Sequence, residues 1–168
     1  MRGHRPRSRR RQRLAFSRIG DVLHVEVFVD PGGDVPPHYH PVQEERCEVL
    51  AGHVRFEIGG RRIEGGPGTR ATAPPGAKHA FRNIGEVEAH LHVEAEPALQ
   101  LQGFLEEAAA LARAGAYTRR GLPRRPGAVI ELADLMVRYW DTTVLTFPPP
   151  IVQRLLLAPV VRLQRKRA

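Results

Sequence analysis

Apolar and polar residues alternate along several stretches of the first hundred residues. In residues 21–29 the positions 23, 25, 27 and 29 are all aliphatic, and the polar residues His24 and Glu26 alternate with them. This period of two residues is typical of a strand with one face in a core. The same pattern predicts strands at residues 45–50, 54–58, 79–83 and 87–95. The predicted core-facing residues are Leu23, Val25, Val27, Val29, Val54, Phe56, Ile58, Ala89, Leu91, Val93 and Ala95.

The hydrophobic period changes after Pro97. Residues 99–116 carry apolar side chains three and four positions apart, which is typical of an amphipathic helix. Residues 128–140 predict a second helix, and residues 151–164 a third, which Pro159 should kink or split.

These patterns divide the chain into a mainly β part and an α-helical extension. One core fits a chain of 168 residues. The expected segments are a disordered basic tail at 1–17, a β-barrel at 18–97, and a helical extension with a basic end at 98–168.

Candidate chemistry concentrates in residues 32–83. His38 and His40 are two positions apart, so in a strand both side chains point to the same side. Glu45 opens the next alternating run and can face them, and His79 opens a strand after a Pro-Pro-Gly turn. Three imidazoles and one carboxylate converging inside a small barrel would form a site for a divalent transition metal.

The spacing of these residues resembles the two sequence motifs of the cupin superfamily. The first, G-x5-H-x-H-x4-E-x6-G, fits Gly32, His38, His40, Glu45 and Gly52. The second, G-x5-P-x-G-x2-H-x3-N, fits Gly68, Pro74, Gly76, His79 and Asn83. The resemblance covers roughly residues 20–97 and is closest to small bacterial cupins. It implies an antiparallel double-stranded β-helix, or jelly-roll barrel, which here precedes the helical extension.

The resemblance also implies a cofactor. One divalent ion (Fe, Mn, Ni, Co, Cu or Zn) would be held by His38, His40, Glu45 and His79. An octahedral ion with these ligands keeps positions open for a substrate or dioxygen. One hypothesis is therefore a metal-dependent enzyme, dioxygenase-like or isomerase-like, that acts on a small organic molecule. The alternative is a non-enzymatic barrel that binds or senses a small molecule and whose helical tail mediates contact with a second copy, a partner or a membrane surface. The fold does not choose between them.

Strand parity adds predictions for residues near the motifs. Cys47 and Phe81 share the parity of the ligands and should point inward, as core packing. His90 and His92 lie opposite the aliphatic face of their strand, which favours an exposed or interface face over a second metal site. Glu44 is expected to be a solvated charge, with an outer carboxylate near the site as the alternative.

The net charge of +8 and the isoelectric point of about 10.9 come mainly from the two ends. Residues 2–13 and 162–167 are rich in arginine. We expect solvated tails here, and a nucleic-acid partner is the weaker alternative. Residues 151–161 are mostly apolar, which favours packing on the barrel or in a homodimer over contact with a membrane surface.

One cysteine leaves no intrachain disulfide, which is typical of a reducing compartment. The chain contains no run of 18 apolar residues, so no membrane span is predicted. The basic N-terminal stretch is not followed by the apolar region that a secretory signal would have. The expected location is the cytoplasm.

Overall fold

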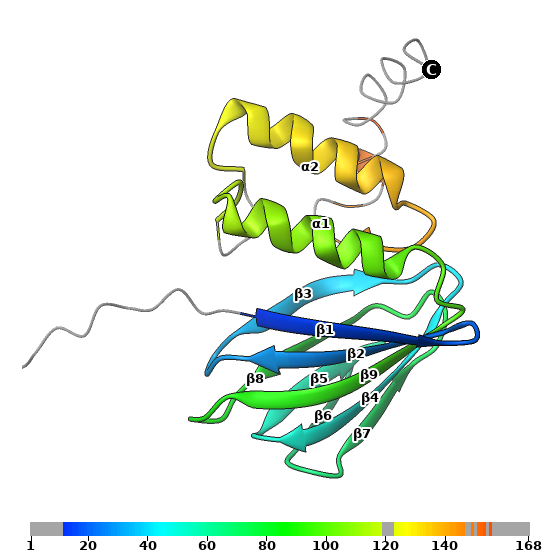
Figure 1. Ribbon diagram of the computed structural model, residues 1–168, viewed down its shortest axis with the longest axis vertical. Coiled ribbons are helices and arrows are strands. Elements are labelled where there is room, and N and C mark those ends of the chain that lie inside the picture. Colours follow the sequence, from blue (N-terminus) through cyan, green and yellow to red (C-terminus); the bar gives the residue numbers. More distant parts are fainter. Residues whose placement is uncertain (1–11, 119–122, 147–148, 150, 154, 156–168) are drawn as a thin grey trace, which may run out of the picture.

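The structure is a computed structural model, which describes residues 12–118, 123–146, 149, 151–153 and 155 (Figure 1). Its β elements form two five-stranded antiparallel sheets, in the orders β1-β2-β9-β4-β7 and β10-β3-β8-β5-β6. The strands are β1 (Gln12–Ile19), β2 (Val22–Val29), β3 (Asp34–Tyr39), β4 (Glu44–Ala51), β5 (Val54–Ile58), β6 (Arg61–Gly65), β7 (Arg70–Ala73), β8 (His79–Asn83), β9 (Ala89–Glu96) and β10 (Val144–Leu145).

The two sheets enclose one apolar core, and the predicted alternation is confirmed. On β2 and β9 every second side chain is buried, and these are the aliphatic residues named from the sequence. Phe56 and Phe81 contribute rings from the facing sheet, with centroids 6.1 Å apart. The fold is thus the expected mainly β jelly roll, followed by helices.

The prediction of a disordered tail up to residue 17 is wrong for residues 12–17, which form most of β1. This strand pairs with β2 over its whole length, from Gln12 opposite Val29 to Ile19 opposite Val22. Leu14 and Phe16 are half-buried and pack against the core. The arginines of this basic segment make its alternation of apolar and polar residues hard to recognise in the sequence. The packing of Leu14 and Phe16 and the pairing with β2 order the segment. The rest of the predicted tail, residues 1–11, lies outside the described part.

Two predicted helices are confirmed: α1 (Leu101–Arg113) is shorter than expected, and α2 (Pro126–Arg138) begins and ends two residues earlier than expected. Leu101 belongs to the barrel core, and Phe104 packs against it. The phenol of Tyr139, just after α2, donates to Glu107 of α1 at 2.8 Å, so the helices contact each other. In the described residues, no helix is long and apolar enough to cross a membrane. Most of the third predicted helix, residues 151–164, is outside the described part.

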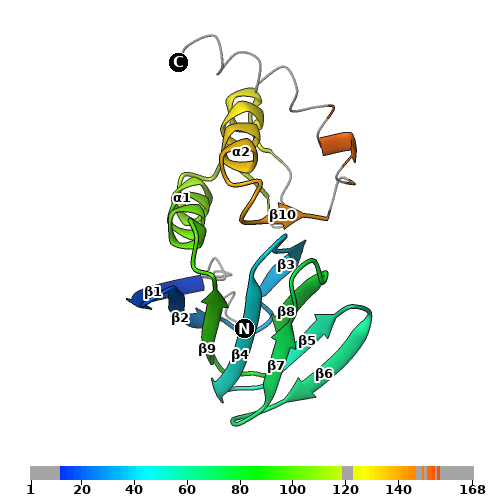
Figure 2. The same ribbon diagram turned by 90° about the vertical axis from the view of Figure 1, so that its right-hand side faces the viewer.

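The extension is not purely helical, which corrects the expectation of a separate helical unit. After α2 the chain returns to the barrel, and β10 pairs with β3 (Figure 2). Val144 is opposite Tyr39, Leu145 is opposite His38, and Val144 is fully buried. Two residues carry too weak a pattern to predict a strand, so only the tertiary structure reveals this contact.

Candidate metal centre

The four predicted ligands come from both sheets and meet at one end of the barrel. His38 on β3 lies directly opposite His79 on β8, and His40 follows β3. Glu45 is on β4 of the facing sheet. All four side chains are buried, and one ligand atom from each lies within 4.8 Å of those from the others. The alternation that buries the core thus also directs these polar groups inward.

The ring nitrogens facing away from this cluster are all engaged by backbone carbonyls. Nδ1 of His38 lies 2.9 Å from the oxygen of Pro36, and Nδ1 of His79 lies 2.9 Å from that of Ala77. Nδ1 of His40 lies 2.7 Å from the oxygen of Thr142. A carbonyl can only accept, so each Nδ1 carries a proton, and each neutral ring has its lone pair on Nε2.

The chemistry of the four candidate ligands suits a bound cation. Nε2 of His79 is buried and has no hydrogen-bond partner among the described residues, and it lies 3.5 Å from Oε1 of Glu45. Nε2 of His40 lies 3.2 Å from the other oxygen of Glu45. Neutral imidazole lone pairs and a carboxylate are all acceptors, so their convergence in a buried place requires a proton or a metal ion between them.

The ionisation of His38 and Glu45 favours the metal-binding forms. Burial, with His79 and His40 nearby, lowers the pKa of His38 to about 3, so this ring is neutral at neutral pH. Burial raises the pKa of Glu45, but the adjacent imidazoles of His40 and His79 outweigh burial, so the pKa of Glu45 lies well below its ordinary value. Burial lowers the pKa of His79, but contact with Glu45 outweighs it and raises that pKa, and a bound metal ion would take the place of the proton between them. A neutral imidazole and an ionised carboxylate are the states that coordinate metals.

The space beside the cluster is small and apolar. It has a volume of about 10 Å³, whereas roughly 10–15 Å³ is needed to hold one water molecule. Cys47 and Phe81 point into the barrel, as predicted from their parity. The Cys47 thiol donates to Oε1 of Glu45 at 3.4 Å, and burial together with that carboxylate raises the pKa of Cys47 well above its ordinary value. The other lining residues are Phe56, Ile58, Ala71, Ala73, His79 and Ala80.

Residues 142–145, which we call the capping segment, are the part of this site that the sequence did not indicate. The Thr142 carbonyl accepts from His40, and the Thr143 hydroxyl lies 3.3 Å from the same ring nitrogen. Both threonines are buried. No residue pattern links positions about a hundred apart, so only the return of the chain after α2 assigns them this role.

Two further motif residues serve the backbone rather than the cluster. The amide nitrogen of Asn83 donates to the carbonyls of Val29 and Val87, at 2.8 Å each, and its oxygen accepts from the backbone of Gly85. Gly52 has φ of +83°, and a Cβ there would lie 2.7 Å from Cα of Ala89. Asn83 therefore links neighbouring backbone segments in the protein interior, and Gly52 permits a close approach of two chain segments.

The remaining candidates lie on the outer face of the first sheet. Glu44 pairs with Arg46 at 2.9 Å, so it is a surface charge, as favoured from the sequence. His90 and His92 are half-buried and both contact Glu26. Their strand therefore has a polar face, as predicted, and the side chains on that face contact one another as well as solvent.

Comparison with known proteins agrees with this architecture. The family model described as "Cupin domain" matches residues 25–94. Protein SchB of Streptomyces halstedii is 36% identical over 63 residues, which cover 38% of this chain and 46% of that protein. Polyketide synthase CurC of Streptomyces cyaneus is 30% identical over 67 residues, which cover 40% and 44%. This chain therefore matches less than half the length of these curated relatives.

Solved structures give similar partial matches. TT1209 from Thermus thermophilus is 26% identical, with a TM-score of 0.49 and coverage of 51% of this chain and 83% of that one. A Klebsiella pneumoniae protein described as having a double-stranded beta-helix domain is 21% identical, with a TM-score of 0.48 and coverage of 57% and 84%.

Proposed function

Since this chain carries a cupin domain in residues 25–94, we propose that the domain binds one divalent transition metal. The ligands would be Nε2 of His38, His40 and His79 and the carboxylate of Glu45. The observation that carries this proposal is the commitment of all three Nδ1 protons to backbone carbonyls, which leaves only acceptors facing one another in a buried site. Such an ion, when bound, supplies Lewis-acid chemistry and, if it is Fe or Mn, oxygen chemistry.

We further propose that the site acts on a small organic molecule as a metal-dependent enzyme. The protein side supplies orientation: the carbonyls of Pro36, Ala77 and Thr142 fix the three rings. Cys47 holds one oxygen of Glu45 through its thiol proton. The apolar lining keeps bulk water from the cluster, which strengthens any polar interaction there.

The narrow interior supports a second candidate, a non-enzymatic barrel that senses a small molecule. A space of about 10 Å³ beside Glu45 and His79 holds no organic substrate, so a substrate would have to reach the metal from the barrel mouth, where the capping segment lies. A sensor needs no turnover, and ligand entry there would displace the capping segment and pass the signal to α2.

One relative offers a first class of compounds to test, because it is named a polyketide synthase. We therefore propose polyketides as initial probes, for turnover and for binding. Turnover supports the enzyme, whereas saturable binding without turnover, accompanied by exposure of residues 142–145 in hydrogen exchange, supports the sensor.

The experiment that tests metal binding is elemental analysis of the untagged protein after reconstitution with Fe²⁺, Mn²⁺ and Zn²⁺ in turn. We expect the His38→Ala/His40→Ala double variant to bind one equivalent less than the native chain. His53→Ala is the matched control, because His53 is an exposed histidine outside the cluster. Equal metal content in the native chain and the folded double variant would refute the proposed site.

A further inference from the structure

The outer face of the first sheet carries a second cluster of histidines and carboxylates. His24 and Glu26 lie on one face of β2, and His92 and Glu94 lie on the same face of the adjacent strand β9. The register pairs His24 directly with Glu94, and Glu26 directly with His92. Because the other face of both strands is the core, this cluster is separate from the candidate metal centre in the barrel.

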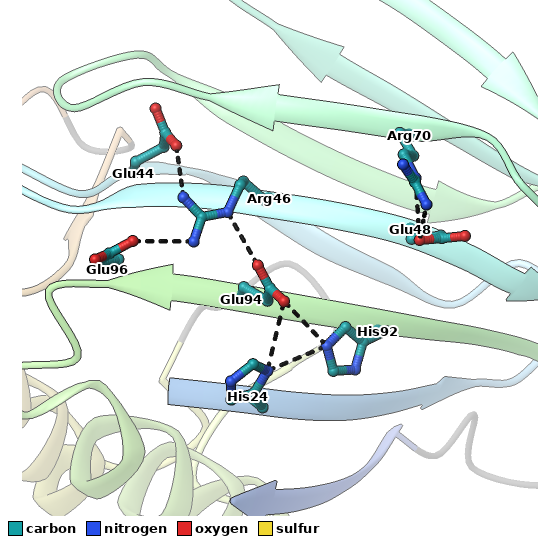
Figure 3. Close-up of polar contacts among 8 residues, drawn as sticks. All are labelled: His24, Glu44, Arg46, Glu48, Arg70, His92, Glu94 and Glu96. Carbon is teal, nitrogen blue, oxygen red and sulfur yellow. Dashed lines mark hydrogen bonds and ion pairs between the residues drawn. The ribbon is translucent and has the colours of Figure 1, made fainter. Parts of the chain in front are cut away.

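Three ligand atoms of this cluster form a compact triangle (Figure 3). Nδ1 of His24 lies 3.2 Å from Nε2 of His92. Oε1 of Glu94 lies 3.6 Å from each of these nitrogens. Ligands about 2.05 Å from a tetrahedral zinc ion lie about 3.3 Å from one another. The three atoms therefore have nearly the spacing of one face of a zinc tetrahedron without any rearrangement.

Neighbouring groups orient two of the three ligand residues, His92 and Glu94, toward the centre of the triangle. Nδ1 of His92 lies 2.7 Å from a carboxylate oxygen of Glu26 and so donates its proton there. That leaves the lone pair of His92 on Nε2, which faces His24 and Glu94. A carboxylate behind a histidine is the usual orienting partner of a metal-bound imidazole. Oε2 of Glu94 accepts from Nε of Arg46 at 3.0 Å, which directs its other oxygen into the triangle.

The local charge also suits a cation. Glu44, Glu94 and Glu96 all contact one guanidinium, that of Arg46, and Glu26 contacts His92, in a chain whose net charge is +8. The hydrogen bond from Arg46 lowers the pKa of Glu94, so this ligand is ionised at neutral pH. At 3.6 Å, Oε1 of Glu94 is too far from either imidazole for a good hydrogen bond.

We propose that His24, His92 and Glu94 bind a second divalent metal ion of the zinc type, with water at the fourth position. Two imidazoles and one carboxylate in a tetrahedral arrangement suit zinc better than magnesium or calcium, which prefer oxygen ligands. The side chains are 18–32% exposed, so an ion can enter from solvent. It would join β2 to β9 across the sheet and stabilise the folded chain in proportion to its occupancy. The proposal does not depend on the ion in the barrel.

Zinc stoichiometry in the untagged full-length protein tests this site. Equilibrium dialysis against Zn²⁺ should show that His92→Gln and Glu94→Gln each bind one equivalent less than the native chain. This difference holds whether the native chain binds two ions or, should the barrel site fail, only one. Substitution with Co²⁺ should give the intense visible absorption of a four-coordinate ion, and the part of the spectrum due to this site should vanish in both variants.

Two matched variants separate a built site from casual binding to surface histidines. Glu26→Gln should keep the zinc equivalent but weaken its affinity about 10- to 100-fold, because the orienting carboxylate is lost. His53→Gln changes an exposed histidine that lies outside the triangle and does not belong to the cluster, and it should keep both stoichiometry and affinity. Equal zinc content in the native chain, His92→Gln and Glu94→Gln would overturn the proposal, as would an equal loss in His53→Gln.

Discussion

Nδ1 of His40 donates to the carbonyl oxygen of Thr142 at 2.7 Å, across 102 residues of sequence. The contact joins the mouth of the barrel to the segment that follows α2. It fixes the ring of one proposed ligand and buries it to 2% exposure. The C-terminal extension is therefore part of the candidate metal centre.

Loosening the capping segment should weaken metal binding without unfolding the barrel. Val144 is fully buried where β10 pairs with β3, so Val144→Asp should detach the segment and free the ring of His40. We expect metal affinity, measured by competition with a chelator, to fall about 10- to 100-fold. Ile130→Asp introduces the same charge at a position 64% exposed on α2 and should leave affinity unchanged. Native affinity in a folded Val144→Asp variant would contradict this role.

The Cys47 thiol should be inert in the folded protein. Its pKa is raised by burial and by the Glu45 carboxylate, and its exposure is 7%. Because the thiolate is the reactive form, iodoacetamide at pH 8 should label the native chain far more slowly than the chain in guanidinium chloride. Mass spectrometry over time measures both rates. Rapid labelling of the folded chain would show that solvent reaches the barrel interior.

Replacing Asn83 should destabilise the fold. Asn83→Ala leaves the carbonyls of Val29 and Val87 without their donor, in a fully buried place. We expect the free energy of unfolding to fall by about 2–4 kcal/mol, measured by urea denaturation. Gln102→Ala removes an exposed side chain that donates to Glu106 on the helix surface, and it should change stability by no more than about 0.5 kcal/mol. A similarly small change for Asn83→Ala would show that the hydrogen bonds of Asn83 do not stabilise the fold.

The metal-free protein should lose stability on mild acidification through His38. Its pKa is about 3 in the folded state against an ordinary value of 6.5, so between these values the unfolded chain binds a proton that the folded chain does not. The contribution of His38 to the free energy of unfolding therefore falls as pH decreases through this window, by up to about 1.4 kcal/mol per pH unit, whereas the raised pKa of His79 acts in the opposite direction.

The His38→Asn variant isolates that contribution. In the presence of a chelator, its unfolding free energy should fall less between pH 6.5 and pH 5 than that of the native chain, by up to about 2 kcal/mol. Chemical denaturation at a series of pH values measures both profiles. Parallel profiles would show that His38 is not held neutral in the folded protein.

Much of this molecule could be predicted from local pattern. Alternation places Val25 and Leu91 in the core and His92 outside it, because side chains in a strand change face at every residue. The same parity, with the motif spacing, brings His38 and His79 to one end of the barrel. A pattern that repeats every two or 3.6 residues involves only neighbours in the sequence, so it can be recognised from the sequence alone.

Pairing between distant segments could not be read in that way. The arginines in and before β1 make its strand pattern hard to recognise in the sequence. The strand is ordered because Leu14 and Phe16 pack on a core that other strands build. The carbonyl of Thr142 reaches His40 only because α2 turns the chain back toward β3. The triangle of His24, His92 and Glu94 depends on the register between β2 and β9. These relationships depend on which surfaces pack together, and packing is decided by the whole folded chain.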